Sequence, residues 1–170
     1  HGWCINKEYF SSQADYFSKR YKVVTIDLGG HGKSGNQRLS WGVQNYASDV
    51  ITVIDSLNLK NVILIGHSMG GDIVMEAALQ RPNKVIGLVG IDNFKDITPQ
   101  YNSEQIRQIA QFMTAVHKDF YNTALSYTKG SLFPANYADT VSVNRVIHDI
   151  QHSDSAIATK TLESLIGFGA

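Results

Sequence analysis

The residues with the clearest chemical potential lie at Gly66-His67-Ser68-Met69-Gly70, where a serine stands between two glycines. A serine hydroxyl attacks a carbonyl carbon once a base takes its proton. The spacing needs a sharp turn from a strand into a helix, and the glycines leave room for its strained backbone. The N–H of Met69, directly after the serine, is placed to bind an oxyanion. The motif therefore predicts Ser68 as a nucleophile with Met69 as an oxyanion donor.

The segments around this motif have the patterns that such a turn requires. Residues 62–65 are four apolar β-formers in a row and predict a buried strand. The periodicity of residues 69–80 predicts a helix that ends before Pro82. Alternating strands and helices predict a parallel sheet with helices on its faces. The other elements expected in this half are strands at 21–27 and 85–91 and helices at 10–20 and 41–57, the latter capped by Ser40.

The sequence changes in character near residue 97, after which no strand pattern returns. Helices are expected at about 103–118, with Ser103 as N-cap, and then at 119–129, 141–151 and 154–166. We therefore expect a partial α/β core at residues 1–96 and a helical cap at residues 97–170. The cap would cover the carboxyl edge of the sheet, where open α/β sheets bind ligands.

Composition excludes several classes of protein. The 170 residues have a formal net charge of zero and no run of Lys or Arg, which argues against nucleic acid or an anionic membrane as a partner. No apolar run is long enough for a membrane span, and the single cysteine excludes an internal disulfide framework. Because the chain begins at His1 without methionine, we expect it to be a fragment, and its compartment is left open.

Other motifs give weaker predictions. Residues 30–35 match a dinucleotide fingerprint, but residues 36–39 separate it from any helix that would hold the phosphate. A phosphate-loop alignment would place Asp27 at the first glycine, where its carboxylate would repel phosphate. His148 and His152 share a helix face without an evident third metal ligand, so we interpret them as solvent-exposed. We therefore predict no cofactor and no metal.

Three segments together resemble the α/β-hydrolase superfamily, in its capped, esterase-like branch. His1–Trp3 is similar to the His-Gly-x loop after the third strand of that fold. Asp27–Ser34 resembles the Asp-x-x-Gly-x-Gly-x-Ser segment after the fourth strand, and Gly66–Gly70 resembles the nucleophile elbow after the fifth. The likeness covers residues 1 to about 96. Residues 97–170 resemble the cap of that family only in being helical.

The resemblance implies a covalent mechanism in which Ser68 is acylated and water then releases the acid. It assigns the oxyanion to the backbone N–H groups of Met69 and Trp3. In the family the catalytic acid and histidine follow late strands, so both are expected beyond Ala170, and this fragment alone is expected to be nearly inactive. Asp92 matches an alternative acid position, although a strand-end carboxylate is its simpler interpretation.

The implied substrate is a small, largely apolar ester, lactone or thioester. His67 flanks the nucleophile, but the resemblance points its ring elsewhere and favours a packing role. Two alternatives remain open on the same scaffold: a receptor-like binding protein that turns over little, and carbon–carbon bond hydrolysis or perhydrolysis.

Overall fold

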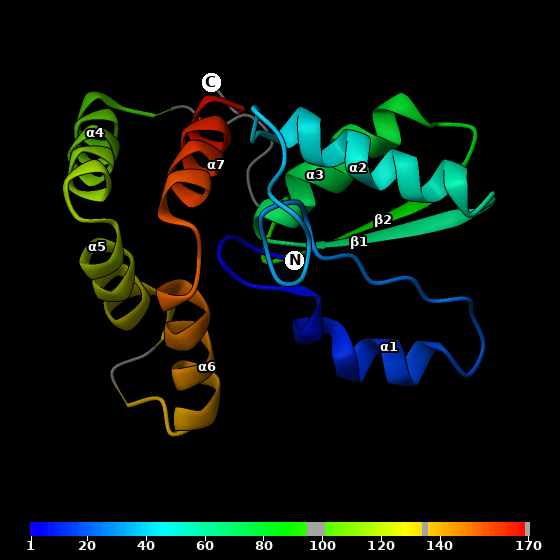
Figure 1. The fold of residues 1–170 in the computed structure, drawn as a ribbon, viewed down its shortest axis with the longest axis horizontal. Helices are drawn as coiled ribbons and strands as arrows, with labels where there is room; N and C mark the ends of the chain where they lie inside the picture. Colours follow the sequence, from blue (N-terminus) through cyan, green and yellow to red (C-terminus); the bar gives the residue numbers. More distant parts are fainter. Residues whose placement is uncertain (95–100, 134–135, 169–170) are drawn as a thin grey trace.

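The computed structural model describes residues 1–94, 101–133 and 136–168 (Figure 1). Within these ranges, no helix combines the length and the apolarity needed to cross a bilayer. The elements in chain order are the 3-10 turn η1 (Lys7–Phe10), α1 (Ser11–Phe17), α2 (Val43–Ser56), β1 (Val62–His67), α3 (Met69–Gln80), β2 (Val85–Ile91), α4 (Ser103–Lys118), α5 (Phe120–Tyr127), the π-helical turn η2 (Thr128–Leu132), α6 (Thr140–Gln151) and α7 (Ser155–Phe168).

β1 and β2 form a parallel sheet, as the alternation of strands and helices predicts. The register pairs Leu64 with Leu88 and His67 with Ile91, so both strands end at the same edge. α3 connects the two strands, and α2 and α3 lie together over one face of the sheet (Figure 1). The buried residues of this sheet-side cluster are Leu28, Trp41, Val43, Tyr46, Ala47, Val50, Ile51, Ile54, Leu64, Met69, Ile73, Val74, Ala77 and Ile157.

Burial of the strands is one-sided, which differs from the prediction of fully buried strands. Leu64 faces the helices and is 9% exposed, whereas Ile63 and Ile65 on the opposite face are 54% and 38% exposed. Side chains alternate between the two faces of a strand, and among the described residues α2 and α3 cover only one face. A continuous apolar run predicts burial of both faces of the strand, whereas the described part of the chain buries only one face.

The strand predicted at residues 21–27 is not formed. Residues 22–28 have no regular secondary structure, and the sheet of the described residues contains only β1 and β2. Val23 and Val24 are 37% and 39% exposed. β-propensity describes how well a side chain fits a sheet, and a strand also needs a neighbouring strand to satisfy its backbone groups. The described residues place no such neighbour beside this segment.

Two predicted N-caps are shifted by tertiary contacts. α2 begins at Val43 after Gly42 rather than near Ser40, and the Val43 N–H donates a hydrogen bond to Ser164 Oγ at 3.2 Å. A serine distant in sequence thus satisfies an N-terminal donor of this helix. α4 is capped by Asn102 rather than Ser103, because Asn102 and Gln105 form a reciprocal capping box.

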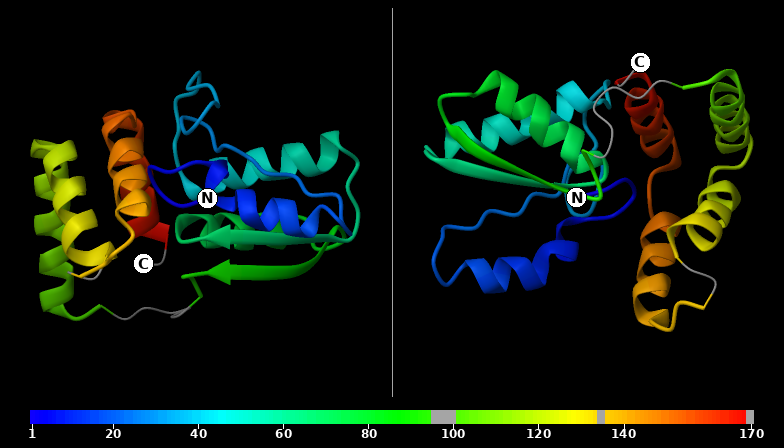
Figure 2. Two further views of the ribbon diagram at one scale, coloured as in Figure 1. Left: turned by 90° about the horizontal axis from the view of Figure 1, so that it is seen from below. Right: turned by 180° about the vertical axis from the view of Figure 1, so that it is seen from behind.

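The helices α4 to α7 lie beyond the carboxyl ends of the strands (Figure 2). They surround a second apolar group, the helical-region cluster. α7 also packs on α2, where the Tyr46 hydroxyl and Thr161 Oγ1 lie 2.8 Å apart. The proposed boundary between core and cap, at residues 96 and 97, lies outside the described residues. The buried members of the helical-region cluster are Cys4, Val116, Phe120, Ala124, Ile150 and Ala158.

Candidate active site

Ser68 occupies the turn between β1 and α3, with a strained backbone at φ 50° and ψ −122°. The predicted strand, turn and helix are therefore confirmed. Few residues other than glycine adopt this conformation, and it persists only where the surroundings impose it. Space for the turn depends on Gly66, because a Cβ there would lie 2.1 Å from the carbonyl oxygen of Gly70.

The turn is held by the end of β2. The Ser68 N–H donates to the Ile91 carbonyl at 2.9 Å, and the Ser68 carbonyl accepts from the Asn93 Nδ2–H at 2.7 Å and from the Gly71 N–H at 2.8 Å. Asn93 was not predicted from the sequence, because an asparagine after a strand gives no signal beyond that of a turn. Its side chain packs against Gly71, where a Cβ would lie 2.2 Å from Asn93 Cγ. These bonds offset the backbone strain at the nucleophile position.

The first loop of the chain packs directly against this turn. A Cβ added to Gly2 would lie 3.4 Å from Ser68 Cβ, and one added to Gly70 would lie 3.0 Å from the His1 carbonyl oxygen. The absence of both side chains lets the two backbones approach closely. The loop therefore brings Trp3, the next residue, to the neighbourhood of Ser68.

The amides assigned to the oxyanion are uncommitted within the described part of the chain. Neither the Trp3 N–H nor the Met69 N–H donates to a backbone carbonyl there, while the Ser68 side chain is only partly buried. Met69 is the first residue of α3, so its N–H is one of the donors that a helix leaves unsatisfied. The role of both amides in binding an oxyanion stays a prediction.

The His1 ring joins the first loop to the segment that follows Asp27. Its Nε2 accepts a hydrogen bond from the Leu28 N–H at 2.9 Å, and its Nδ1 lies 2.9 Å from the Gly2 carbonyl oxygen. Because Nε2 accepts, the proton resides on Nδ1, which donates to that carbonyl. The Asp27 carboxylate in turn accepts from the Lys7 N–H at 2.8 Å. All three segments that carry the resemblance thus meet in the structure.

His67 and Asp92 flank the turn, the first as the last residue of β1 and the second directly after β2. A Cβ on Gly2 would lie 3.0 Å from His67 Nδ1, so the ring packs against the first loop, as predicted. Burial lowers the pKa of His67, and the Asp92 carboxylate acts in the opposite direction. Asp92 follows β2 with φ 52°. Its role as a catalytic acid stays a prediction.

Burial of His31 makes the stability of this region dependent on pH. The ring is 7% exposed and its Nδ1 lies 3.1 Å from the Gly29 carbonyl oxygen. Burial lowers the pKa of His31, and this outweighs the opposing effect of that carbonyl. A lowered pKa contributes stability above the unfolded value of about 6.5, which is lost as the pH falls below it.

The variant His31→Phe keeps a ring against Tyr46. We therefore expect its free energy of unfolding to decrease less from pH 7.5 to pH 5 than that of the parent protein. Urea titrations of both proteins at the two pH values measure this difference. Equal losses would show that His31 does not titrate with unfolding.

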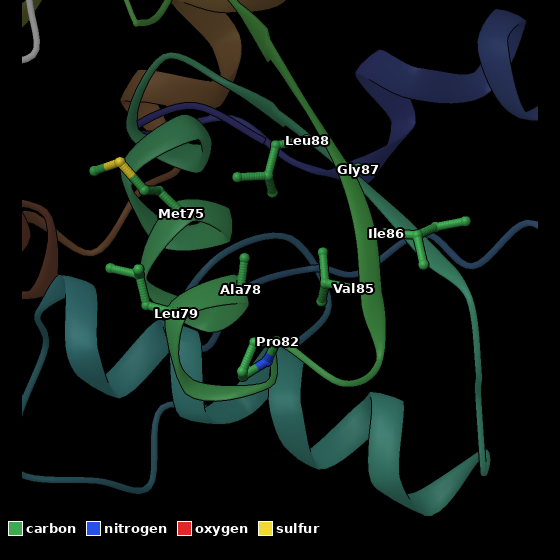
Figure 3. Close-up of a pocket in the computed structure, with 8 residues that line it drawn as sticks. All are labelled: Met75, Ala78, Leu79, Pro82, Val85, Ile86, Gly87 and Leu88. Atoms are coloured by element: carbon green, nitrogen blue, oxygen red, sulfur yellow. The ribbon is translucent and has the colours of Figure 1, made fainter.

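The two histidines of α6 and a hollow beside α3 do not supply a catalytic site. The His148 and His152 rings stack with centroids 4.0 Å apart on α6, and the His148 side chain is 67% exposed, in agreement with the solvent-exposed interpretation. The described residues contain no group of three or more His, Cys, Asp or Glu arranged for a metal ion. A hollow of about 340 Å³ lies between α3 and the start of β2 (Figure 3), but only apolar residues and a glycine line it, so it offers no catalytic group.

Comparison with known proteins identifies the class to which this fold and site belong. The family model for the alpha/beta hydrolase fold matches residues 1–149, so the chain belongs to that family. A putative esterase/lipase from Haemophilus influenzae is 46% identical over 76 residues, which are 45% of this chain and 26% of that protein. A non-heme chloroperoxidase from Burkholderia pyrrocinia is 36% identical over 72 residues, which are 42% of this chain and 26% of that protein.

Solved structures show the same fold. An esterase from Exiguobacterium antarcticum superposes with a TM-score of 0.81 at 22% identity, over 97% of this chain and 63% of that chain. The chain thus spans well under two thirds of the curated relatives and slightly under two thirds of this solved structure.

Proposed function

We propose that the protein containing this chain is a serine hydrolase that cleaves a small, largely apolar carboxylic ester, lactone or thioester. The observation that carries this proposal is the strained backbone of Ser68 at the turn from β1 into α3, against which the loop containing Gly2 and Trp3 packs. The family membership supports a hydrolase, and the esterase names of the relatives favour a carboxylic ester as substrate.

In the proposed reaction the Ser68 oxygen attacks the carbonyl carbon while a general base takes its proton. The carbonyl oxygen gains a negative charge, which the N–H groups of Trp3 and Met69 bind. The base gives the proton to the oxygen or sulfur of the breaking acyl bond, and an acyl-enzyme remains on Ser68. The alcohol of an ester or the thiol of a thioester then departs, whereas the new hydroxyl of a lactone stays attached to the acyl group. Water then attacks the acyl carbon with the same base, which releases the acid and restores the hydroxyl. Neither His67, which packs against Gly2, nor His1, whose ring is bonded to Leu28, is assigned as the base.

In this proposal the region of α4 to α7 is the cap. It lies off the carboxyl ends of the strands, where the nucleophile turn also stands (Figure 2). Ligands of open α/β sheets bind at that edge, so a substrate would lie between Ser68 and these helices.

Perhydrolysis is the second candidate on this scaffold. The likeness to a non-heme chloroperoxidase favours it, because the same acyl-enzyme gives a peracid when hydrogen peroxide replaces water. Peracid formation from an ester with hydrogen peroxide, at the expense of acid formation, would identify this activity.

Labelling with a fluorophosphonate probe tests the proposal in the protein expressed from the complete gene. We expect labelling of the parent protein, loss of labelling in Ser68→Ala, and full labelling in Ser48→Ala, which changes an exposed serine on α2. p-Nitrophenyl esters of increasing acyl length then define the substrate size. A folded parent protein that resists the probe would overturn the hydrolase proposal and favour a receptor-like binding protein.

A further inference from the structure

Trp3 lies between the two apolar clusters of the molecule and packs against both of them. Its backbone belongs to the loop that adjoins Ser68, whereas its side chain reaches into the helical region. Among the partly buried residues that pack on the two clusters, it is the one common to both within the described ranges. The same residue thus contacts the nucleophile side and the helical side of the candidate site.

Specific contacts hold the Trp3 side chain to two helices. The indole N–H donates a hydrogen bond to the Ala158 carbonyl of α7 at 2.8 Å. The indole also meets the Phe120 ring of α5 edge-on, with centroids 5.7 Å apart and an interplanar angle of 73°. Buried tryptophan usually satisfies its N–H in this way, and an edge-on aromatic pair stabilises beyond its area of contact. These two contacts fix the direction of the indole.

The helix that accepts this hydrogen bond is itself fixed to α2. The Tyr46 hydroxyl and Thr161 Oγ1 form a buried hydrogen bond of 2.8 Å between α2 and α7. Ala158 and Thr161 lie three residues apart on α7, so they share one side of the helix. The position of α7 on α2 therefore decides where the Ala158 carbonyl meets the indole.

We propose that Trp3 is a positioning residue. Through its indole bond to Ala158, it couples the position of the α4–α7 region to the geometry of the oxyanion site. This inference rests on the proposed function, in which the Trp3 N–H binds the oxyanion. The amide and the indole belong to one residue, so a shift of α7 reorients the amide. Oxyanion donors act over a narrow range of about 2.7–3.1 Å, and a misplacement of about 1 Å costs up to 10²-fold in rate.

The coupling has a kinetic consequence. A substrate that contacts the helical region and fixes its position also orients the oxyanion donor. The binding energy of that contact then appears in kcat rather than in KM. Loss of the indole bond should therefore lower kcat and leave KM nearly unchanged. A purely structural role of Trp3 would also lower the apparent kcat, but only in proportion to the loss of folded enzyme, which circular dichroism measures.

Trp3→Phe tests the coupling in the protein expressed from the complete gene, because it keeps an aromatic ring beside Phe120 and removes the indole N–H. We expect kcat for short p-nitrophenyl esters to fall about tenfold, with KM changed less than about twofold. The matched control is Trp41→Phe, the same replacement in the sheet-side cluster, which should change kcat less than about twofold. Circular dichroism verifies that both variants are folded.

A double-mutant cycle with Tyr46→Phe separates coupling from general destabilisation. Tyr46→Phe removes the hydroxyl that bonds Thr161, and it should lower kcat severalfold when Trp3 is present. The same change should have little further effect in the Trp3→Phe background, because the link to the oxyanion donor is already broken. Additive losses, or equal losses in Trp3→Phe and Trp41→Phe, would overturn the coupling. A parent protein without labelling at Ser68 would instead refute the proposed function.

Discussion

In the protein expressed from the complete gene, replacing Ser68 with glycine is expected to reduce turnover about a million-fold and to leave the protein more stable than the Ser68→Ala variant. Both substitutions remove the hydroxyl of the proposed nucleophile. They differ in the backbone, because Ser68 has φ 50° and ψ −122°, a conformation that costs about 1–3 kcal/mol for residues with a Cβ. Glycine adopts this conformation without strain. It lowers the free energy of unfolding by about 0.4–1 kcal/mol, because the unfolded chain gains freedom. The net difference should be about 1 kcal/mol in favour of glycine.

Thermal unfolding of the two variants measures this difference. For a protein of this size, 1 kcal/mol corresponds to a shift in Tm of about 2–4 °C, which calorimetry resolves. Because neither variant has the hydroxyl, the comparison isolates backbone strain from the loss of polar contacts. A lower Tm for Ser68→Gly than for Ser68→Ala would show that the turn carries no strain, and the argument for an imposed nucleophile geometry would fail.

The turn at Ser68 was predictable because it is encoded locally. The apolar run before it, the glycines around it and the helical period after it lie within one short segment, and the structure has β1, the turn and α3 in that order. The second strand, Val85–Ile91, was equally clear for the same reason. Local patterns set the backbone path wherever the neighbouring element in space is also the neighbour in sequence.

Features that depend on distant partners were not predictable in this way. The segment at residues 21–27 has strand propensity but no strand beside it among the described residues. The start of α2 depends on Ser164, and the nucleophile turn depends on Asn93. Sequence spacing contains no information about which side chain will meet which backbone across the fold. The amide of Trp3 entered only through resemblance to a family, and its link to Ala158 required coordinates.

Gly66→Val is expected to destabilise the protein by more than about 4 kcal/mol and to abolish labelling of Ser68. A Cβ at Gly66 would lie 2.1 Å from the Gly70 carbonyl oxygen and 2.6 Å from the Gly71 nitrogen. Both atoms belong to the backbone of α3, so no rotamer change relieves the overlap. Only a movement of the first turn of the helix away from the strand makes room, and that movement displaces the N–H of Met69.

Gly87→Val provides the matched control on the neighbouring strand. A Cβ at Gly87 would meet only the Ile63 side chain, at 3.6 Å, which is an ordinary contact. Valine also suits a strand better than glycine does, so this variant should be at least as stable as the parent and should label normally. Urea unfolding gives the free energies, and probe labelling gives the integrity of the turn. If Gly66→Val retained both stability and labelling, the close approach of β1 and α3 would not be what shapes the nucleophile turn.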